Sequence, residues 1–215
     1  MAEPIPFPRP REAVPSLPAA APGMIRTTIT YLEMTEKPSR TFRPPPPEKS
    51  ALLRAERCTV SYYRYLYDTV GGPWLWWFRR AMPEQELAAI IGDERVEIFV
   101  LYVGGVPAGY AEIDRRVEGT ANLAYFGLVP DFIGHGLGPW LLDWAVDAAW
   151  AGAGVTRVTV NTCTLDHPKA LMMYQRAGFQ PVRQEEKEEP DPRLAGHLPR
   201  GIAPTYPWWN REQSG

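Results

Sequence analysis

The sequence predicts a mixed α/β (α+β) domain, and three observations lead to this fold class. A segment with strand composition, residues 25–34, opens the domain before any helix is expected. Two apolar segments, 96–103 and 106–115, flank Gly104-Gly105, a pair suited to the tight turn of an antiparallel hairpin. Strands and helices alternate only in the later part of the chain, which excludes a doubly wound parallel sheet.

The composition indicates a globular chain and narrows its partners. Of its 215 residues, 45% are hydrophobic, enough for one domain with a buried core, and the formal net charge is −2. No basic run interleaves with aromatic residues and no apolar run reaches the length of a membrane span, so we expect neither nucleic acid nor membrane as a partner. The N-terminus lacks the apolar core of a signal peptide, and Cys58 and Cys163 lack metal-ligand spacing, so we expect a cytoplasmic protein without a bound metal.

Prolines and charges divide the chain. A proline-rich stretch at 37–49 is expected to be a loop, and residues 184–189 form a charge run expected to be solvated. Trp208-Trp209 are expected to lie against the domain, with partner binding as the alternative. Three regions are expected in chain order: a flexible Pro/Ala-rich tail, residues 1–23; the folded domain, residues 24–182; and a charged, tryptophan-containing tail, residues 183–215.

Helices are expected between the first strand and the hairpin. Residues 50–68 have a helical pattern that ends before Gly71-Gly72-Pro73. Residues 83–92 are expected to form a short helix, because Pro83 and two glutamates suit a first turn and Gly92 suits its end.

Strands and helices alternate after the hairpin. Residues 121–129 are apolar and 155–162 are rich in β-branched side chains, so both are expected to be strands. Residues 169–177 are expected to form a helix, because Gly178 stands where a left-handed cap is favoured. Residues 179–182 form the last expected strand.

A glycine-rich loop joins the strand at 121–129 to a helix that begins at Leu137. Glycines stand at 134, 136 and 138, and taken alone they favour a simple turn. Backbone N–H groups at such a junction point outward, with the positive end of the helix dipole behind them, so the junction is also a candidate anion site. Two common phosphate-loop patterns, G-x-x-x-x-G-K-[ST] and G-x-G-x-x-G, are absent. The apolar face expected for the helix comprises Leu137, Trp140, Leu141, Trp144, Ala145 and Ala148.

Two blocks of the sequence resemble those of the GNAT (GCN5-related N-acetyltransferase) superfamily. The loop resembles the family's pyrophosphate loop, Q/R-x-x-G-x-G/A, and Ile133 stands where the family has Arg or Gln. The run from 166 to 179 resembles the second block, N-x-x-A-x-x-x-Y-x-x-x-G-F, with His167 in place of Asn. The resemblance covers residues 25–182, and its matching positions are Gly136, Gly138, Ala170, Tyr174, Gly178 and Phe179.

The resemblance implies a fold, a cofactor and an activity. The fold would have a mostly antiparallel central sheet, a splayed pair of parallel strands and flanking helices. The protein would move an acetyl group from acetyl-CoA (coenzyme A) to an amine by direct attack in a ternary complex. The residues implied in cofactor binding are Leu128, Val129, Gly134, His135, Gly136, Leu137, Gly138, Asn161, His167, Ala170 and Tyr174.

The resemblance also implies a catalytic role for Tyr174, whose phenol would protonate the departing thiolate as general acid. The sequence constrains the identity of the general base less. Alternation along the second hairpin strand puts Ala108, Tyr110, Glu112 and Asp114 on one face. We expect Glu112 to take the amine proton, directly or through water, with Asp114 as the other candidate.

An aromatic segment, residues 62–78, has two explanations of about equal weight: core packing, or one wall of an acceptor pocket. The second favours a small-molecule or peptide amine of apolar or aromatic character. The residues expected to contact it are Tyr62, Trp74, Trp77, Asp114 and Tyr125. A catalytically idle acyl-CoA-binding or partner-binding module is the alternative function, and a homodimer stays open.

Overall fold

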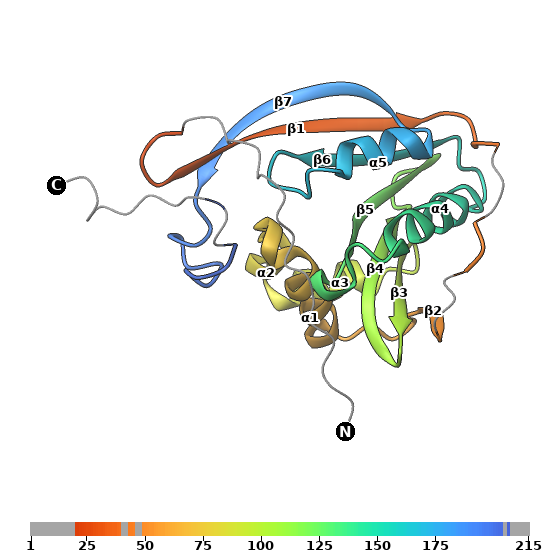
Figure 1. The fold of residues 1–215 in the computed structure, drawn as a ribbon, viewed down its shortest axis with the longest axis horizontal. Coiled ribbons are helices and arrows are strands. Elements are labelled where there is room, and N and C mark those ends of the chain that lie inside the picture. Colours follow the sequence, from red (N-terminus) through yellow and green to blue (C-terminus); the bar gives the residue numbers. More distant parts are fainter. Residues whose placement is uncertain (1–19, 40–42, 46–48, 204–205, 207–215) are drawn as a thin grey trace.

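The computed structural model describes residues 20–39, 43–45, 49–203 and 206. Within them, a seven-stranded sheet has the strand order β2-β3-β4-β5-β6-β1-β7 (Figure 1). The strands are β1 (Met24–Met34), β2 (Ser50–Arg54), β3 (Val96–Val103), β4 (Val106–Asp114), β5 (Thr120–Leu128), β6 (Arg157–Cys163) and β7 (Gln180–Pro190). The helices are α1 (Val60–Gly71), η1 (Gly72–Trp74), α2 (Phe78–Ala81), α3 (Glu84–Ile91), η2 (Pro130–Phe132), α4 (Leu137–Trp150) and α5 (Ala170–Ala177).

Most neighbouring strands are antiparallel, and β5 with β6 is the parallel pair among the described strands. The first strand, β1, lies between β6 and β7, so the beginning of the domain completes the C-terminal half of the sheet (Figure 1). The mixed α/β fold class with a mostly antiparallel sheet, a parallel pair and flanking helices is confirmed.

The sheet has a hydrophobic core on each face. Helices α4 and α5 pack with Leu123 and Phe126 of β5 in one cluster. Helices α1 and α3 pack with Ile98 and Tyr110 in the other. The strand β5 therefore lies between helices on both sides, and this position brings residues from both helical layers close to it.

The segment 50–54, expected to be helical, is instead β2, and the helix begins only at Val60. Thr59 caps that helix, because its hydroxyl accepts a hydrogen bond of 3.3 Å from the Tyr62 amide. Pairing of β2 with residues 99–103 of β3 supplies backbone hydrogen bonds that local composition does not reveal. Tertiary pairing therefore overrides the helical pattern in this segment.

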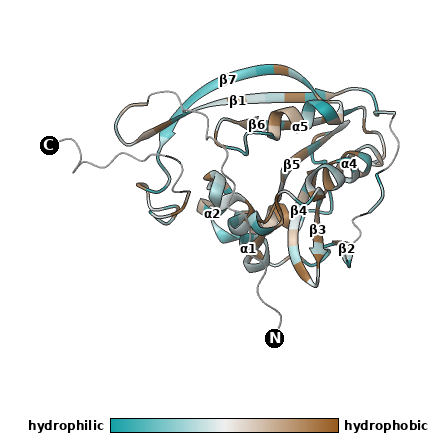
Figure 2. Cartoon of the chain, in the orientation of Figure 1, coloured by the Kyte–Doolittle hydropathy of each residue, from teal (hydrophilic) through white to brown (hydrophobic). Residues whose placement is uncertain are grey.

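The last strand runs to Pro190, so its expected end at Val182 is wrong. The charge run 184–189 is part of β7, an exposed edge strand that pairs with β1 and is largely hydrophilic (Figure 2). Arg26 and Glu188 form a cross-strand ion pair of 2.8 Å. Charged side chains on an edge strand discourage pairing with a second chain. The tail at 1–19 and Trp208-Trp209 lie outside the described residues.

The expected apolar face of α4 packs against the core, whereas the face expected for β4 is partly wrong. Ala108 packs on the α4 side, because an irregularity in the β3–β4 pairing next to Leu101 shifts the alternation of β4. On α4, the indoles of Trp140 and Trp144 are only half-buried. The buried residues of that helix are Leu137, Leu141, Leu142, Asp143, Ala145, Val146 and Ala149.

Candidate active site

The strands β5 and β6 separate part-way along their length. They pair at Thr120–Leu123 with Arg157–Val160, and β5 then continues to Leu128 without a described partner on that side. Ala124 is an extra residue opposite β4, where the register passes from Leu123 to Tyr125. Such a bulge bends a strand and increases its twist. The bulge therefore explains why β5 turns away from β6 and opens a V between them (Figure 1).

The open edge of β5 presents backbone amides to this V. The Val129 amide is taken, because it donates to the Ala108 carbonyl at 2.9 Å. Bonded and non-bonded pairs alternate along antiparallel strands, so the amides of Phe126 and Leu128 face away from β4. Leu128 and Val129 are both implied in cofactor binding, and of their two amides that of Leu128 is therefore the one left available.

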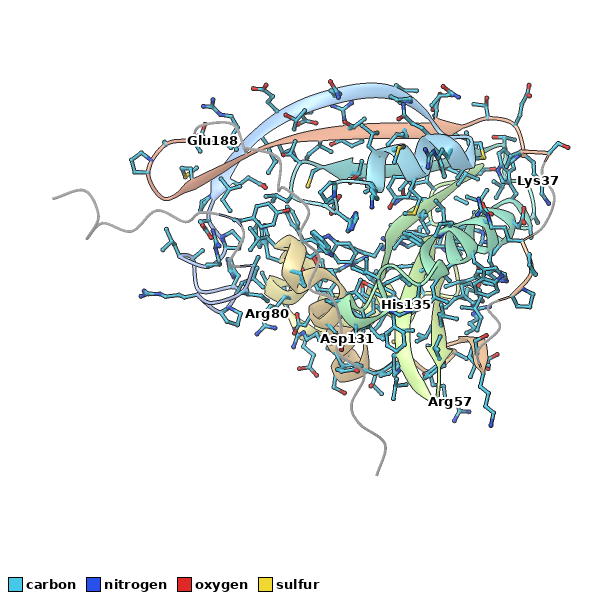
Figure 3. All side chains as sticks on the ribbon, viewed as in Figure 1. Lys37, Arg57, Arg80, Asp131, His135 and Glu188 are labelled. Atoms are coloured by element: carbon cyan, nitrogen blue, oxygen red, sulfur yellow. The ribbon has the colours of Figure 1, made fainter. Side chains whose placement is uncertain are left out.

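The glycine loop has the geometry of an anion site. Gly134 and Gly136 have φ values of 93° and 75°, and a side chain built at either would meet no atom within 4 Å. The amides of Gly134, His135 and Gly136 have no hydrogen-bond acceptor in the part of the chain that the structure describes. Helix α4 begins at Leu137, so its N-terminal dipole adds to these donors. The His135 side chain is exposed beside them (Figure 3).

Tyr174 lies on α5, with its ring edge-to-face between Phe126 of β5 and Phe179. The side chain is 6% exposed, and its hydroxyl has no hydrogen-bond partner among the described residues. Burial raises the pKa of Tyr174, and the carboxylate of Asp166 raises it further. The phenol therefore stays protonated and has a proton free to donate.

Asp166 links two elements, and the sequence pattern alone indicates no role for it. Its Oδ2 accepts hydrogen bonds from the Thr162 hydroxyl at 2.8 Å and the Cys163 amide at 2.9 Å. Its Oδ1 accepts from Nε1 of Trp76 at 3.1 Å. An aspartate just before a helix is a common capping residue, so its place in the sequence does not indicate the long-range contact with Trp76.

Aromatic rings from α1, the following turn and β5 form one cluster. Tyr67, Trp76 and Tyr125 lie within 5.1–5.5 Å of one another, measured between ring centroids. Trp74 contacts His167 at 5.3 Å. Tyr67 is buried in the core, whereas Trp74, Trp76 and Tyr125 are half-buried. The aromatic segment therefore contributes both core and accessible surface.

The other residues expected at the acceptor have different partners. Tyr62 makes a hydroxyl pair of 2.5 Å with Tyr102 on β3, and Trp77 stacks on His197 at 5.1 Å. Asp114 forms an ion pair of 2.6 Å with Arg116. Contact of these three with an acceptor stays a prediction.

Glu112 is fully buried on β4. One oxygen accepts from Arg79 at 2.8 Å, and the other accepts from the Tyr63 hydroxyl at 2.5 Å. Burial raises the pKa of Glu112, and this rise remains although Arg79 and Tyr63 act to lower the pKa. The Arg79 guanidinium also lies 5.3 Å from the ring centroid of Tyr125. Glu112 therefore contacts the aromatic cluster through Arg79, and its carboxylate is enclosed by protein atoms. Its role as the base stays a prediction.

The remaining expected cofactor residues lie where β6 leads into α5. Asn161 is exposed near the end of β6, and Ala170 begins α5. Nδ1 of His167 accepts from the Lys169 amide at 3.1 Å, which orients the ring at the helix entrance. Gly138 of the loop approaches α5, since a side chain built there would stand 3.8 Å from the Met173 sulfur.

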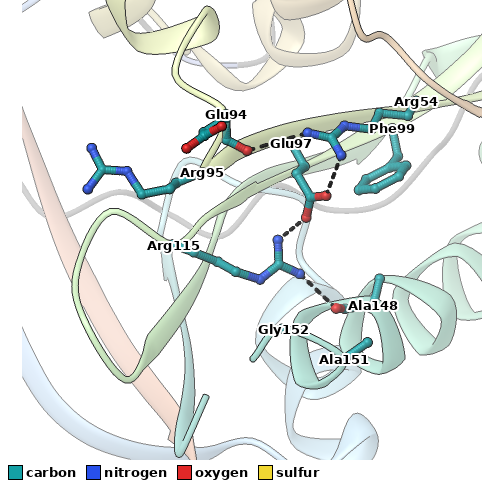
Figure 4. A pocket seen from close by; sticks show the side chains of 9 residues that line it. All are labelled: Arg54, Glu94, Arg95, Glu97, Phe99, Arg115, Ala148, Ala151 and Gly152. Carbon is teal, nitrogen blue, oxygen red and sulfur yellow. Dashed lines mark hydrogen bonds and ion pairs between the residues drawn. The ribbon is translucent and has the colours of Figure 1, made fainter. Parts of the chain in front are cut away.

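A groove of about 700 Å³ lies at the opposite end of α4 (Figure 4). Glu97 pairs with both Arg54 and Arg115, and Arg115 donates to the Ala148 carbonyl at 2.7 Å. These contacts hold the end of α4 on the sheet. Among the described residues, there is no helix long and apolar enough to cross a membrane and no group of three or more potential metal ligands.

Residues 61–179, more than half of the chain, match the sequence family described as "Acetyltransferase (GNAT) family". The protein belongs to the GNAT acetyltransferase family. This membership supports acyltransferase activity and acyl-CoA binding in general terms. No curated protein matches the chain.

Solved structures share the fold at low sequence identity. A functionally unknown conserved protein from Staphylococcus epidermidis is 17% identical, with a TM-score of 0.54 over 79% of this chain and 64% of its own. A putative GNAT acetyltransferase from Novosphingobium aromaticivorans is 15% identical, with a TM-score of 0.51 over 80% and 68%. A GCN5-related N-acetyltransferase from Sphaerobacter thermophilus is 16% identical, with a TM-score of 0.52 over 75% and 51%. The chain thus spans less than two thirds of the Staphylococcus and Sphaerobacter proteins.

Proposed function

We propose that this GNAT protein transfers an acetyl group from acetyl-CoA to the amine of a small molecule or peptide by direct attack in a ternary complex. One observation carries the proposal. At the V between β5 and β6, the amides of Gly134–Gly136 have no acceptor among the described residues, and the phenol of Tyr174, which has no hydrogen-bond partner among them either, lies against β5 at Phe126. An anion-binding loop and a proton donor beside one cleft match the diphosphate and the thioester at the two ends of an acyl-CoA.

The loop amides would bind the diphosphate, and the open edge of β5 would pair with the amide groups of the pantetheine arm. The amides of residues 134–138 do not depend on side chains, so Ile133 in place of Arg or Gln removes one polar contact and leaves these donors. The Leu128 amide would then hold the thioester oxygen as negative charge develops on it.

The reaction forms a nitrogen–carbon bond and breaks the carbon–sulfur bond. The amine nitrogen attacks the thioester carbonyl carbon, and the tetrahedral intermediate expels the thiolate. Tyr174 would give its proton to the sulfur. The amine would lose its own proton to water, because the burial of Glu112 argues against direct contact. Within this proposal Glu112 is a positioning residue that acts through Arg79 and Tyr125.

Substitution of Tyr174 by Phe tests the proposal. Thiol release from acetyl-CoA is measured with a panel of aromatic and aliphatic amines, and coenzyme A affinity is measured by calorimetry. We expect Tyr174→Phe to lower kcat by about 10²–10⁴ and to leave coenzyme A affinity unchanged, because the phenol acts on the leaving group. Binding of coenzyme A without turnover on any amine would instead favour an idle acyl-CoA-binding module, and equal kcat in both proteins would remove Tyr174 as the acid.

A further inference from the structure

We infer that Asp166 is a positioning residue for the acceptor: it holds the indole of Trp76 across the mouth of the V between β5 and β6. The inference rests on the proposed acetyl transfer, and it concerns the acceptor side of that site. It assigns a role to a residue that matches no fixed position of the loop pattern or of the second sequence block.

Asp166 is fixed on the β6 side. Its Oδ2 receives the Thr162 hydroxyl and the Cys163 amide, both from the last residues of β6. The carboxylate therefore moves with the end of β6, at the place where this strand no longer pairs with β5. Only Oδ1 is directed to a different element, and it accepts from Trp76 at 3.1 Å.

Trp76 is fixed on the β5 side. Its ring lies 5.3 Å from Tyr125, and a side chain built at Gly127 would stand 3.9 Å from its Cη2. A side chain built at Gly71 would lie only 2.2 Å from the indole, so this glycine makes room for the ring. The hydrogen bond to Asp166 thus connects the surface of β5 with the end of β6.

The C-terminal segment supports both partners of this bridge from outside. The Tyr206 hydroxyl donates to the Leu165 carbonyl at 2.5 Å, one residue before Asp166. A side chain built at Gly72 would lie 2.7 Å from Ile202, so the turn before Trp76 is packed just as closely. Both ends of the bridge are therefore held, as expected for a surface that must keep a defined shape.

The indole end of the bridge lies on the aromatic side of β5, whereas the loop amides precede α4, which packs on the other side. Loss of the bridge would therefore free the indole and disturb the acceptor without disturbing the diphosphate. The expected signature is a change in the acceptor KM with unchanged affinity for coenzyme A.

Kinetics of four variants test this inference: Trp76→Phe, Asp166→Asn, their combination, and Trp144→Phe. Trp76→Phe removes the indole donor and keeps an aromatic ring. Trp144→Phe makes the same change on α4, where the ring packs against Phe99. Steady-state rates are measured against acceptor and acetyl-CoA separately, together with coenzyme A affinity and thermal unfolding.

We expect Trp76→Phe and Asp166→Asn each to raise the acceptor KM by about 10-fold or more, because a hydrogen bond to a charged group is lost. The double variant should be no worse than the poorer single variant, since both remove one interaction. Trp144→Phe should leave the acceptor KM unchanged. An unchanged acceptor KM in Trp76→Phe overturns the inference while acetyl transfer stands. A wild-type protein that acetylates no amine overturns both. If Asp166→Asn does not fold, Trp76→Phe decides the question.

Discussion

The two ends of the V are built in different ways. The loop end consists of consecutive residues, 134–138, whose backbone would supply the binding groups. The proposed acceptor end is assembled from α1, the turn after it, β5, the loop after β6 and the C-terminal segment. A site made of backbone tolerates changes of side chain, whereas a site made of distant side chains depends on the packing of the whole domain. A site made of backbone suits a coenzyme, whose chemistry is constant, and a site made of side chains suits an acceptor, whose chemistry varies.

The largest effect is expected at the acceptor end. Arg79→Met leaves the carboxylate of Glu112 buried without its cation, and the side chains of this pair are only 8% and 0% exposed. Removal of one partner of a buried ion pair costs about 3–5 kcal/mol of the free energy of unfolding. Chemical denaturation measures this loss. A variant as stable as the wild type would show that the pair does not support the aromatic cluster.

Two further variants sharpen this result. Arg116→Met removes an ion pair of the same strand that is more exposed, and it should cost at most about 1 kcal/mol. Arg79→Met combined with Glu112→Gln should recover part of the lost stability, because no unpaired charge remains buried. If Glu112 were instead the base, Glu112→Gln would lower kcat by about 10²–10⁴ without a matching loss of stability.

A smaller effect is expected at the loop end. Gly136→Ala forces a side chain onto a residue with φ of 75°, which costs about 1–2 kcal/mol. Gly154→Ala is the matched control, because this glycine has φ of 73° and equally open surroundings beyond the far end of α4. Both variants should lose similar stability, and only Gly136→Ala should bind coenzyme A more weakly, by about 10-fold. Equal affinities in calorimetry would remove the loop from the cofactor site.

The difference between a site of consecutive residues and a site of distant side chains also explains which parts of the molecule the sequence predicts. Gly134, Gly136 and Tyr174 occur in local patterns whose spacing alone indicates a loop and a helix face, and the structure forms this loop and this helix. Asp166 and Arg79 act through partners 90 and 33 residues away, and no local pattern records such contacts. The strand β2 was missed for the same reason, since its pairing with β3 lies 40 or more residues along the chain. Local geometry is therefore predictable here, and long-range side-chain contacts are not.

The smallest effect is expected from a change of pH, and it concerns the phenol of Tyr174. Backbone amides do not titrate, so any ionisation of the protein that limits the rate must come from side chains. The pKa of Tyr174 is raised from the ordinary tyrosine value of 10.0 by burial and by Asp166. A raised pKa keeps the phenol protonated above the pH at which an exposed tyrosine would lose its proton. With both substrates saturating, kcat should therefore show no fall assignable to Tyr174 between about pH 7 and pH 10. A fall of kcat at high pH with an apparent pKa of about 10 or less, present in the wild type and absent from Tyr174→Phe, would mean that the phenol of Tyr174 is exposed to water.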